Sequence, residues 1–454
     1  MYDELLEKGD VVDIRYPAKG FIVVKPWGMR IIKHLYREFE DLLEEDGHHP
    51  VHFPAVIPED NLRKEGEHFK GFESEVFWIT RAGLKELQKK LILRPTSETA
   101  IYPMFALWIK GHSDLPVKVY LSEAVWRYET KATRPLIRGR EFLWIETHDA
   151  FRTHEDAHAQ VLKDLEIATK VIKELLKLDF IMVRRPDWDR FAGAEYTYAI
   201  DVLLPDGKVL QIATTHNLGQ KFAKVFDIKF MDKDEQEKYV HQTCFGIGIY
   251  RILASIIYIH GDEVGLRLPS AVAPVQVAVI PVKPEAEEYA KEISKDIPYR
   301  TEVDLSQKSP GNKFFYWDKK GVPAKVVVGP KEMQEGTVTI SMRTGEKITV
   351  PREKMVQVLS EKIKEYDEGL FKPIAIKDVS SLDELEQAIK EKKVARAGFC
   401  SISEEGKQCY QVIKEKFNAE VRGERIDIQE SPEGMKCLVC GKEAKHVVYI
   451  AKQY

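Results

Sequence analysis

Residues 116–151 read PVKVYLSEAVWRYETKATRPLIRGREFLWIETHDAF, and this stretch predicts a long antiparallel hairpin. The segments 116–129 and 140–151 are extended in character, and a polar, basic loop lies between them. Side chains carried by a rigid strand can be held in register with one another. We therefore expect functional side chains on this hairpin.

The charged residues at the two strand ends are the first candidates for a binding site. Arg127-Tyr128-Glu129 ends the first strand, and Arg138-Gly139-Arg140-Glu141-Phe142 begins the second. An arginine can hold a phosphate or a carboxylate through two parallel hydrogen bonds, and a glutamate can accept from an amino group. The same charges also suit a cross-strand ladder on a solvated face.

A glycine-rich pattern further along the chain is the second candidate. It reads Cys244-Phe-Gly246-Ile-Gly248-Ile-Tyr-Arg251 and is followed by an apolar run. Glycines before a helix let the backbone approach a ligand closely, and Arg251 on the first helical turn can meet a phosphate. Simple packing of a helix on a sheet would explain the glycines equally well.

Length and composition describe a multidomain globular chain. It has 454 residues, of which 44% are hydrophobic and 31% are charged, and this length predicts two or three domains. The formal net charge is −4, so a role with nucleic acid depends on a local patch. The N-terminus lacks the pattern of a signal peptide, and no segment offers about 18 unbroken apolar residues. We therefore expect a cytoplasmic protein with no membrane partner.

The order of periodic segments divides the chain into three parts. Helical spacing is predicted over 28–46 and 154–177, with short strands up to about residue 230. Near residue 270 prolines flank an alternating valine strand, and from there strands and helices alternate, which predicts a mostly parallel sheet with an edge hairpin. We place the domains at 1–270, 271–370 and 371–454.

The cysteines favour a metal site in the last domain. There are five, and four of them lie beyond residue 399. Cys437 and Cys440 are separated by two residues, which lets both thiolates face one tetrahedral ion, and Cys400 and Cys409 supply a looser pair. These four predict a structural Zn²⁺ site, whereas Cys244 is expected to be a small core residue, with a lining role at the site as the alternative.

A basic stretch at 307–331 is the candidate contact with RNA. It contains six lysines and one aspartate, a local charge of 6 − 1 = +5, interleaved with Phe314, Phe315, Tyr316 and Trp317. Phosphate attraction and base stacking are both available from such a sequence. A solvated amphipathic helix is the simpler explanation.

The hairpin and the glycine pattern together resemble the second and third motifs of class II aminoacyl-tRNA synthetases. Residues 28–54 resemble the first motif, with Pro54 as its proline. Within that class the chain is similar to prolyl-tRNA synthetases in LRPTSETAIYP, REFLWIETHDAF, FAGAEYTYAID, QIATTHNLGQKF, GVPAKVVVGPKEM and the C-terminal cysteine segment. The resemblance implies an α/β multidomain protein: a class II antiparallel-sheet catalytic domain, an α/β anticodon-binding domain and a small α+β zinc-binding C-terminal domain.

The resemblance also implies a reaction: ATP activates L-proline to prolyl-adenylate, and proline is then transferred to tRNA(Pro). Catalysis would rest on positioning and charge stabilisation, with Mg²⁺ among the phosphates and Arg127 and Arg251 as the catalytic residues. The residues that the resemblance assigns to proline are Thr96, Glu98, Arg127, Phe72, Trp144, His148, Phe191 and His216. Those that it assigns to ATP are Arg127, Glu129, Arg138, Gln211, Thr214, Gly246, Gly248 and Arg251.

Further expectations concern the partners and the fidelity. The resemblance implies a homodimer formed through residues 28–56, and anticodon contacts from Lys313 and Lys325, with Asp318 where relatives usually show glutamate. The stretch from Phe151 to Gly246 is too short for a bacterial-type editing domain, so side activation of alanine or cysteine is expected.

Three alternatives to this interpretation require other residues. A threonyl enzyme would need an active-site zinc with Cys and His ligands, and a glycyl enzyme would not need Thr96, Glu98 and an aromatic pocket. A non-catalytic synthetase-like protein would typically lack the phosphate arginines, yet Arg127, Arg138 and Arg251 are all present.

Overall fold

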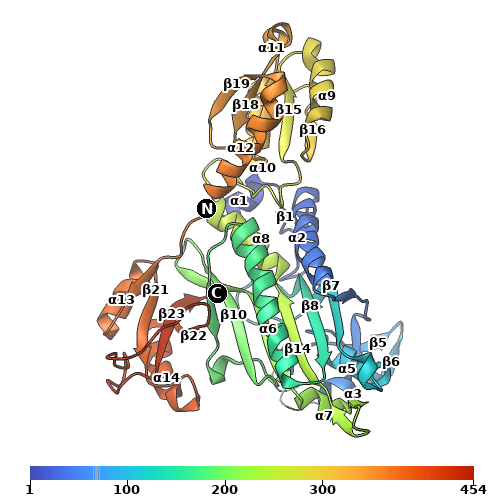
Figure 1. The fold of residues 1–454 in the computed structure, drawn as a ribbon, viewed down its shortest axis with the longest axis vertical. Coiled ribbons are helices and arrows are strands. Elements are labelled where there is room, and N and C mark those ends of the chain that lie inside the picture. The colour runs from blue at the N-terminus through green and yellow to red at the C-terminus, as the bar shows by residue number, and fades with distance from the viewer. Residues whose placement is uncertain (65, 67–69, 71) are drawn as a thin grey trace.

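The computed structural model describes every residue of the chain except 65, 67–69 and 71. A large central body carries one domain at its upper end and another at its side, as Figure 1 shows. The upper domain is the middle part of the sequence, and the side domain is the C-terminal part. We call them the central body, the middle domain and the C-terminal domain.

The central body is built on an antiparallel sheet with helices packed on it. Its elements are α1 (Tyr2–Lys8), β1 (Val12–Asp13), β2 (Val23–Val24), α2 (Pro26–Glu45), β3 (His49–Pro50), β4 (Val56–Pro58), α3 (Glu59–Lys64), β5 (Phe77–Ala82), β6 (Lys85–Leu93), α5 (Glu98–Trp108), β7 (Val117–Trp126), β8 (Glu141–Phe151), α6 (His154–Thr169), β9 (Ile181–Arg184), β10 (Tyr196–Leu203), β11 (Lys208–Gly219), α7 (Lys221–Phe226), β12 (Lys229–Met231), β13 (Glu237–Tyr239), β14 (His241–Ile247) and α8 (Ile249–His260).

The predicted hairpin is confirmed as β7 and β8. They pair antiparallel without a register shift, from Val117 opposite Ala150 to Trp126 opposite Glu141. The helix predicted over 28–46 is α2, which begins at a proline in its first turn. The helix predicted over 154–177 is α6, and it continues as one wider π-helical segment at Lys170–Leu175.

The strand order places the hairpin towards one end of the large sheet, between β14 and the last strand, β3. Within the described residues the large sheet runs β20-β21-β23-β22-β9-β10-β11-β14-β8-β7-β3. The side chains of α2 and α8 share one buried apolar cluster with residues of this sheet, while α5 and α7 share another.

The middle domain confirms the predicted alternation of strands and helices. Its elements are β15 (Val277–Pro281), α9 (Glu287–Asp296), β16 (Thr301–Val303), α10 (Pro310–Lys320), β17 (Ala324–Val328), α11 (Pro330–Glu335), β18 (Thr337–Met342), β19 (Lys347–Pro351) and α12 (Met355–Glu368). The strands β16, β15 and β17 are parallel neighbours, and β18 and β19 form the expected antiparallel hairpin at the edge.

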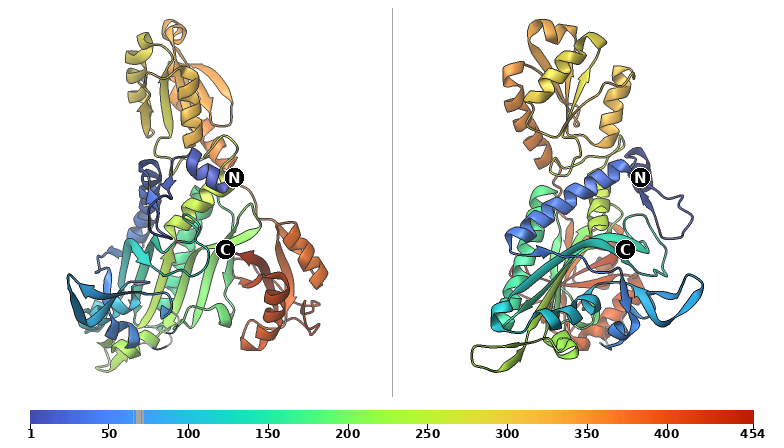
Figure 2. Two further views of the ribbon diagram at one scale, coloured as in Figure 1. Left: turned by 180° about the vertical axis from the view of Figure 1, so that it is seen from behind. Right: turned by 90° about the vertical axis from the view of Figure 1, so that its right-hand side faces the viewer.

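The C-terminal domain extends the central sheet. Its elements are β20 (Ile376–Asp378), α13 (Leu382–Lys390), β21 (Val394–Phe399), α14 (Lys407–Phe417), β22 (Glu420–Arg425) and β23 (His446–Gln453). Strand β22 pairs with β9, and the end of β23 pairs with β11. Val183 and Val209 of the central body share a buried apolar cluster with Tyr449 and Ala451. Figure 2 shows the C-terminal strands beside those of the central body.

Among the described residues, no helix has both the length and the apolar character needed to span a lipid bilayer.

Candidate functional site

A cavity of about 390 Å³ opens above the central sheet, in the size range of small-ligand sites. The hairpin, β11, β14 and the start of α8 contribute to its walls. The predicted site residues that line it are Phe72, Thr96, Glu98, Arg127, Glu129, Arg138, Trp144, Phe191, Gln211, Thr214, His216, Gly246, Gly248 and Arg251. Segments separated by up to 179 positions (251 − 72) therefore meet in one place.

Strand register brings the floor residues together. His216 lies opposite Cys244, and Cys244 lies opposite His148, in one row across three strands. Two positions along, Thr214 lies opposite Gly246, and Gly246 opposite Glu146. Residues paired in this way share a face of the sheet, so alternate positions on each strand reach the cavity.

The carboxylate end of the cavity is a compact hydrogen-bonded group. The Thr96 hydroxyl donates to Glu98 at 2.5 Å and lies 3.2 Å from a carboxylate oxygen of Glu146. The backbone N–H and the hydroxyl of Ser97 also donate to Glu146. Glu98 is 2% exposed and Glu146 is 3% exposed. Two buried carboxylates beside a hydroxyl form a site that favours a cation with N–H donors.

Arg127 lies between this hydrogen-bonded group and the aromatic residues that line the cavity. Its Nε donates to the carbonyl oxygen of Pro95 at 3.0 Å. The guanidinium carbon lies 5.2 Å from the ring centre of Phe72, 5.3 Å from Phe142 and 5.5 Å from Trp144. Among the described residues, no carboxylate forms an ion pair with it, so its remaining N–H groups are available to an anion.

Two further arginines converge on the same cavity. Arg251 donates to the carbonyl oxygens of Ile137, at 3.1 Å, and Gln211, at 2.9 Å. Burial, and then the nearby charges of Arg127 and Arg138, lower the pKa of Arg251 to about 10. Arg138 lies 3.7 Å from Glu129. Cations that repel one another in a buried site are stabilised by an anionic ligand, so this side of the cavity has the chemistry to take an anion.

The aromatic end contains an uncharged histidine. His216 lies against Phe191, with ring centres 4.5 Å apart and ring planes tilted by 31°, and its Nδ1 is 2.9 Å from the Thr197 hydroxyl. Burial, and then the charge of His148, lower the pKa of His216 to about 3. At neutral pH this ring is therefore a flat, neutral wall suited to a small apolar ring.

His148 does not line the cavity, contrary to the expected place around the proline ring. Its Nε2 lies 3.1 Å from Glu146 and its Nδ1 3.2 Å from the hydroxyl of Tyr102, which covers it from α5. Burial disfavours the charged ring, but the bond to Glu146 raises the pKa of His148 overall. His148 thus orients the carboxylate of Glu146 from a position outside the cavity wall.

Several lining residues were not predicted from the sequence. They are Glu75, Leu136, Ile137, Gly139, Phe142, Leu143, Glu146, Asp189, Arg190, Thr197, Ile212, Ala213, Phe245 and Tyr250. For Glu146 a signal existed, because it alternates with Trp144 and His148 on one strand face. Cys244 is a buried residue and also part of the cavity wall, and burial, then Glu98, raise the pKa of its thiol.

Gly246 and Gly248 line the cavity, where the absence of a side chain leaves room beside the sheet. A Cβ on Gly246 would lie 3.2 Å from the Trp144 ring, and one on Gly248 would lie 3.1 Å from the carbonyl oxygen of Ile212. Both distances are tighter than ordinary contact, so packing as well as ligand access favours glycine at both positions.

The four C-terminal cysteines form the predicted cluster. The sulfur atoms of Cys400, Cys409, Cys437 and Cys440 all lie within 4.8 Å of one another, and those of Cys400 and Cys409 are 3.7 Å apart. Tetrahedral ligation at Zn–S distances of about 2.3 Å requires sulfur separations of about 3.8 Å. The cluster therefore fits a structural zinc ion.

The basic stretch of the middle domain is less exposed than its sequence suggests. Of its six lysines, Lys313, Lys320 and Lys325 are buried. Lys313 donates to the carbonyl oxygen of Asp304 at 2.8 Å, and Lys325 forms an ion pair with Asp318. Anticodon contacts from Lys313 and Lys325 thus stay a prediction, while Phe315 and Tyr316 are exposed as stacking requires.

The fold and the three arginines define the class of protein. The family profile described as "tRNA synthetase class II core domain (G, H, P, S and T)" matches residues 77–260. "Anticodon binding domain" matches residues 276–362, and "Prolyl-tRNA synthetase, C-terminal" matches 382–454. The chain contains a class II aminoacyl-tRNA synthetase core with an anticodon domain.

Full-length comparisons narrow the class to one family. The chain is 46% identical to the proline–tRNA ligase of Thermofilum pendens and 42% identical to that of Pyrococcus abyssi, covering 100% of this chain and 96% and 97% of those relatives. The structure matches "Giardia lamblia Prolyl-tRNA synthetase in complex with prolyl-adenylate" with a TM-score of 0.93 and 34% identity, over 100% of this chain and 97% of that one. The chain belongs to the proline–tRNA ligase family.

Proposed function

We propose that the protein activates L-proline with ATP to prolyl-adenylate and transfers proline to tRNA(Pro). The observation that carries the proposal is the arrangement of one cavity. A carboxylate pair at Glu98 and Glu146 lies at one end, and three arginines with few carboxylate partners lie at the other. An amino acid has a cationic and an anionic end, so it can bridge these two groups.

Proline binding follows from the chemistry of its ammonium group. Prolinium has two N–H donors, and Glu98 with Thr96 offers a carboxylate and a hydroxyl to accept them. Phe191, Trp144 and the neutral His216 enclose the ring. Trp144 Nε1 is buried and, among the described residues, has no hydrogen-bond partner, so it can donate to the bound substrate.

Activation is an in-line attack of the proline carboxylate on the α-phosphorus of ATP, with pyrophosphate leaving. Arg127 would bridge the attacking carboxylate and the α-phosphate. Arg138 and Arg251 would hold the remaining phosphates, with Glu129, Gln211 and Thr214 towards the nucleotide. Mg²⁺ bound with ATP neutralises phosphate charge. Preorganised charge of this kind supplies the catalysis without a side-chain nucleophile.

The other partners follow from the remaining domains. We assign residues 271–370 to the anticodon of tRNA, residues 1–270 to catalysis, and residues 371–454 to a structural zinc ion held by the four cysteines. We also propose a cytoplasmic homodimer formed through residues 28–56. In support, β3 within that region is the last strand of the large sheet and its edge is exposed.

Pyrophosphate exchange with all twenty amino acids tests the proposed reaction. We expect proline to give the highest rate, with slower exchange for alanine or cysteine, because apolar contacts alone reject a smaller side chain by only about 1–3 kcal/mol per methylene. Exchange that is fastest with another amino acid would refute proline specificity. No exchange with both alanine and cysteine would refute the side activity alone.

Metal analysis and sedimentation test the remaining assignments. We expect one zinc per chain in the purified protein and less than half of that in Cys437→Ser, with Cys244→Ser as the matched control that keeps its zinc. Equal zinc in both variants would refute the cluster as the site. Sedimentation equilibrium should give twice the chain mass, and a monomer would refute the dimer.

A further inference from the structure

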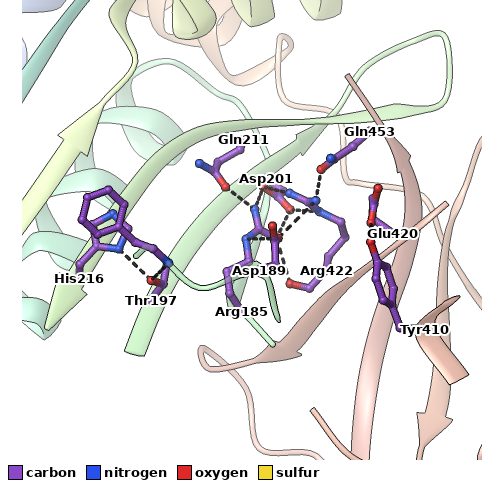
Figure 3. A network of polar contacts seen from close by, with 11 residues as sticks. Arg185, Asp189, Thr197, Asp201, Gln211, His216, Tyr410, Glu420, Arg422 and Gln453 are labelled. Carbon is purple, nitrogen blue, oxygen red and sulfur yellow. Dashed lines mark hydrogen bonds and ion pairs between the residues drawn. The ribbon is translucent and has the colours of Figure 1, made fainter. Parts of the chain in front are cut away.

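A buried network joins the C-terminal domain to the nucleotide side of the cavity (Figure 3). Its members are Arg185 on the segment after β9, Asp201 on β10, Gln211 on β11 and Arg422 on β22. Arg185 is 3% exposed, Asp201 is 0% and Arg422 is 2%. Three charged groups this deeply buried need close mutual pairing.

Asp201 is the centre of this pairing. Its Oδ1 accepts from Arg185 at 2.6 Å and from Arg422 at 3.2 Å. Its Oδ2 accepts from the same arginines at 2.9 Å and 2.7 Å. Burial alone would raise the pKa of Asp201, but the two guanidinium groups hold it well below its usual range. The carboxylate is thus ionised and fixed by four hydrogen bonds.

Arg185 connects the fixed carboxylate of Asp201 to a residue of the cavity wall. Its Nη2 also donates to Oε1 of Gln211 at 2.7 Å. Since a guanidinium can only donate, the amide oxygen of Gln211 must face it, and the NH₂ group is directed elsewhere. The carbonyl oxygen of Gln211 meanwhile accepts from Arg251. One residue therefore contacts the buried network through its side chain and a phosphate-site arginine through its backbone.

Local irregularities in two strands make this contact possible. On β10 and β11 the register moves from Ile200 opposite Ala213 to Asp201 opposite Gln211, which leaves Ile212 as an extra residue. On β22 the register moves from Val421 to Gly423, which leaves Arg422 as the extra one. β-Bulges of this kind redirect side chains near active sites. Gly423 has φ +124°, and a Cβ there would lie 1.9 Å from the carbonyl oxygen of Arg184.

A neighbouring loop is attached to the C-terminal domain as well. The N–H of Asp187 donates to the carbonyl oxygen of Ile402 at 2.9 Å, and Trp188 stacks on Tyr410 with ring centres 5.2 Å apart. The next residue, Asp189, lines the cavity and lies 3.6 Å from Arg185. The C-terminal domain therefore supports two walls of the cavity.

We propose that Arg422, Asp201 and Arg185 are positioning residues that fix the side-chain amide of Gln211 for ATP. The C-terminal domain thereby takes part in nucleotide binding without touching the nucleotide. This inference rests on the proposed function, because it assigns ATP to the Gln211 side of the cavity. It predicts that breaking the network weakens ATP binding and leaves proline binding unchanged.

The test compares Arg422→Met with Arg396→Met in the full-length protein. Arg396 lies in the same domain and pairs with Glu430 and Asp378, away from the cavity, so it is a matched control. We expect Arg422→Met to raise both the KM for ATP in pyrophosphate exchange and the Kd for ATP by calorimetry about 3–10-fold. The KM for proline should stay within about twofold, Arg422→Lys should recover part of the loss, and Arg396→Met should match the parent.

A double variant shows whether Arg422 acts through Gln211. In the Gln211→Ala background, Arg422→Met should change the KM for ATP by less than about twofold, because the group that it positions is gone. Additive effects, or an unchanged ATP Kd in Arg422→Met, would overturn the inference. If Arg422→Met does not fold, Arg185→Lys replaces it in the test. This variant keeps the positive charge but loses the paired N–H donors of the guanidinium group.

The two failures can be told apart. If the parent protein shows no proline-dependent exchange, the proposed function is refuted. Calorimetry with ATP still shows whether breaking the network weakens ATP binding. A parent that does not bind ATP refutes both.

Discussion

The basic residues of the cavity and those of the middle domain look alike in the sequence but differ in the structure. Arg127 and Arg251 donate to backbone carbonyl oxygens and face a cavity. Lys320 and Lys325 instead form ion pairs with Asp10 and Asp318 inside packed regions. A buried cation that faces a cavity and has no carboxylate partner can take an anionic ligand, whereas a paired cation in a packed region contributes to the fold. The difference lies in the partners, not in the residue type.

Removing an unpaired cation should have the largest effect. We expect Arg127→Gln to lower kcat/KM in proline-dependent pyrophosphate exchange by roughly 10²–10³-fold, because a preorganised charge on the reacting groups is lost. Arg127→Lys should be nearly as impaired, since the fork geometry is lost. Arg81→Gln, on the exposed β5 strand, is the control and should be unaffected. Near-normal activity in Arg127→Gln would contradict the role given to unpaired cations.

Glu98, at the other end of the cavity, allows the corresponding test with a negative charge. Glu98→Gln should raise the KM for proline about 10–100-fold with little change in the KM for ATP, because a charged hydrogen bond to the ammonium becomes a neutral one. Glu86→Gln on the exposed strand β6 is the control. Steady-state exchange kinetics separate the two constants, and an equal rise in both would argue for general disruption of the site.

Paired and exposed lysines of the middle domain should separate stability from RNA binding. Lys325→Met should lower the free energy of unfolding by about 1–3 kcal/mol, because it removes one member of a buried pair. Lys308→Ala, at an exposed position, should leave stability unchanged and reduce the slope of log Kd for tRNA against log salt by about 1.

Filter binding over a series of salt concentrations, with thermal unfolding in parallel, measures both effects. Loss of tRNA affinity in Lys325→Met without loss of stability would favour the predicted anticodon contact for this residue.

The same comparison can be made between buried carboxylates, for which we expect the smallest of the predicted effects. Asp201 is paired with two arginines, whereas Asp164 accepts hydrogen bonds from two uncharged groups, the amide of Gln160 and the hydroxyl of Thr215. Burial, and then the charge of Asp149, raise the pKa of Asp164 to about 7. The folded state therefore keeps a proton that the unfolded chain releases near pH 4. The contribution of this group to stability falls as pH rises from about 4 to 7.

Asp164→Asn should remove this fall, changing the difference in unfolding free energy between pH 4 and pH 8 by about 1–2 kcal/mol. Denaturant unfolding at both pH values measures it. Glu166→Gln, on the same helix but exposed, is the control. An identical pH dependence in Asp164→Asn and the parent would show that Asp164 is ionised despite its burial.

Much of the site could be predicted because strand alternation and family motifs act over short distances. Trp144 and Arg251, which the family resemblance assigned to the site, both line the cavity. His148 was misplaced because nothing in its own strand shows that Tyr102, from helix α5, covers it. Arg185 and Arg422 were missed because they lie 237 positions apart, and they become a unit only through the shared carboxylate of Asp201 and the hydrogen bond from Arg185 to the carbonyl oxygen of Arg422.

The sequence alone determined the elements of this protein: the β7–β8 hairpin, the glycines that precede α8, the alternating middle domain and the four cysteines of the C-terminal cluster. These are set by side-chain periodicity, backbone freedom and ligand spacing within short segments. The tertiary structure alone decided which charges are paired, because burial and pairing depend on residues brought from distant segments. It also decided that the C-terminal strands continue the central sheet, since backbone hydrogen bonds between strands leave little trace in side-chain sequence.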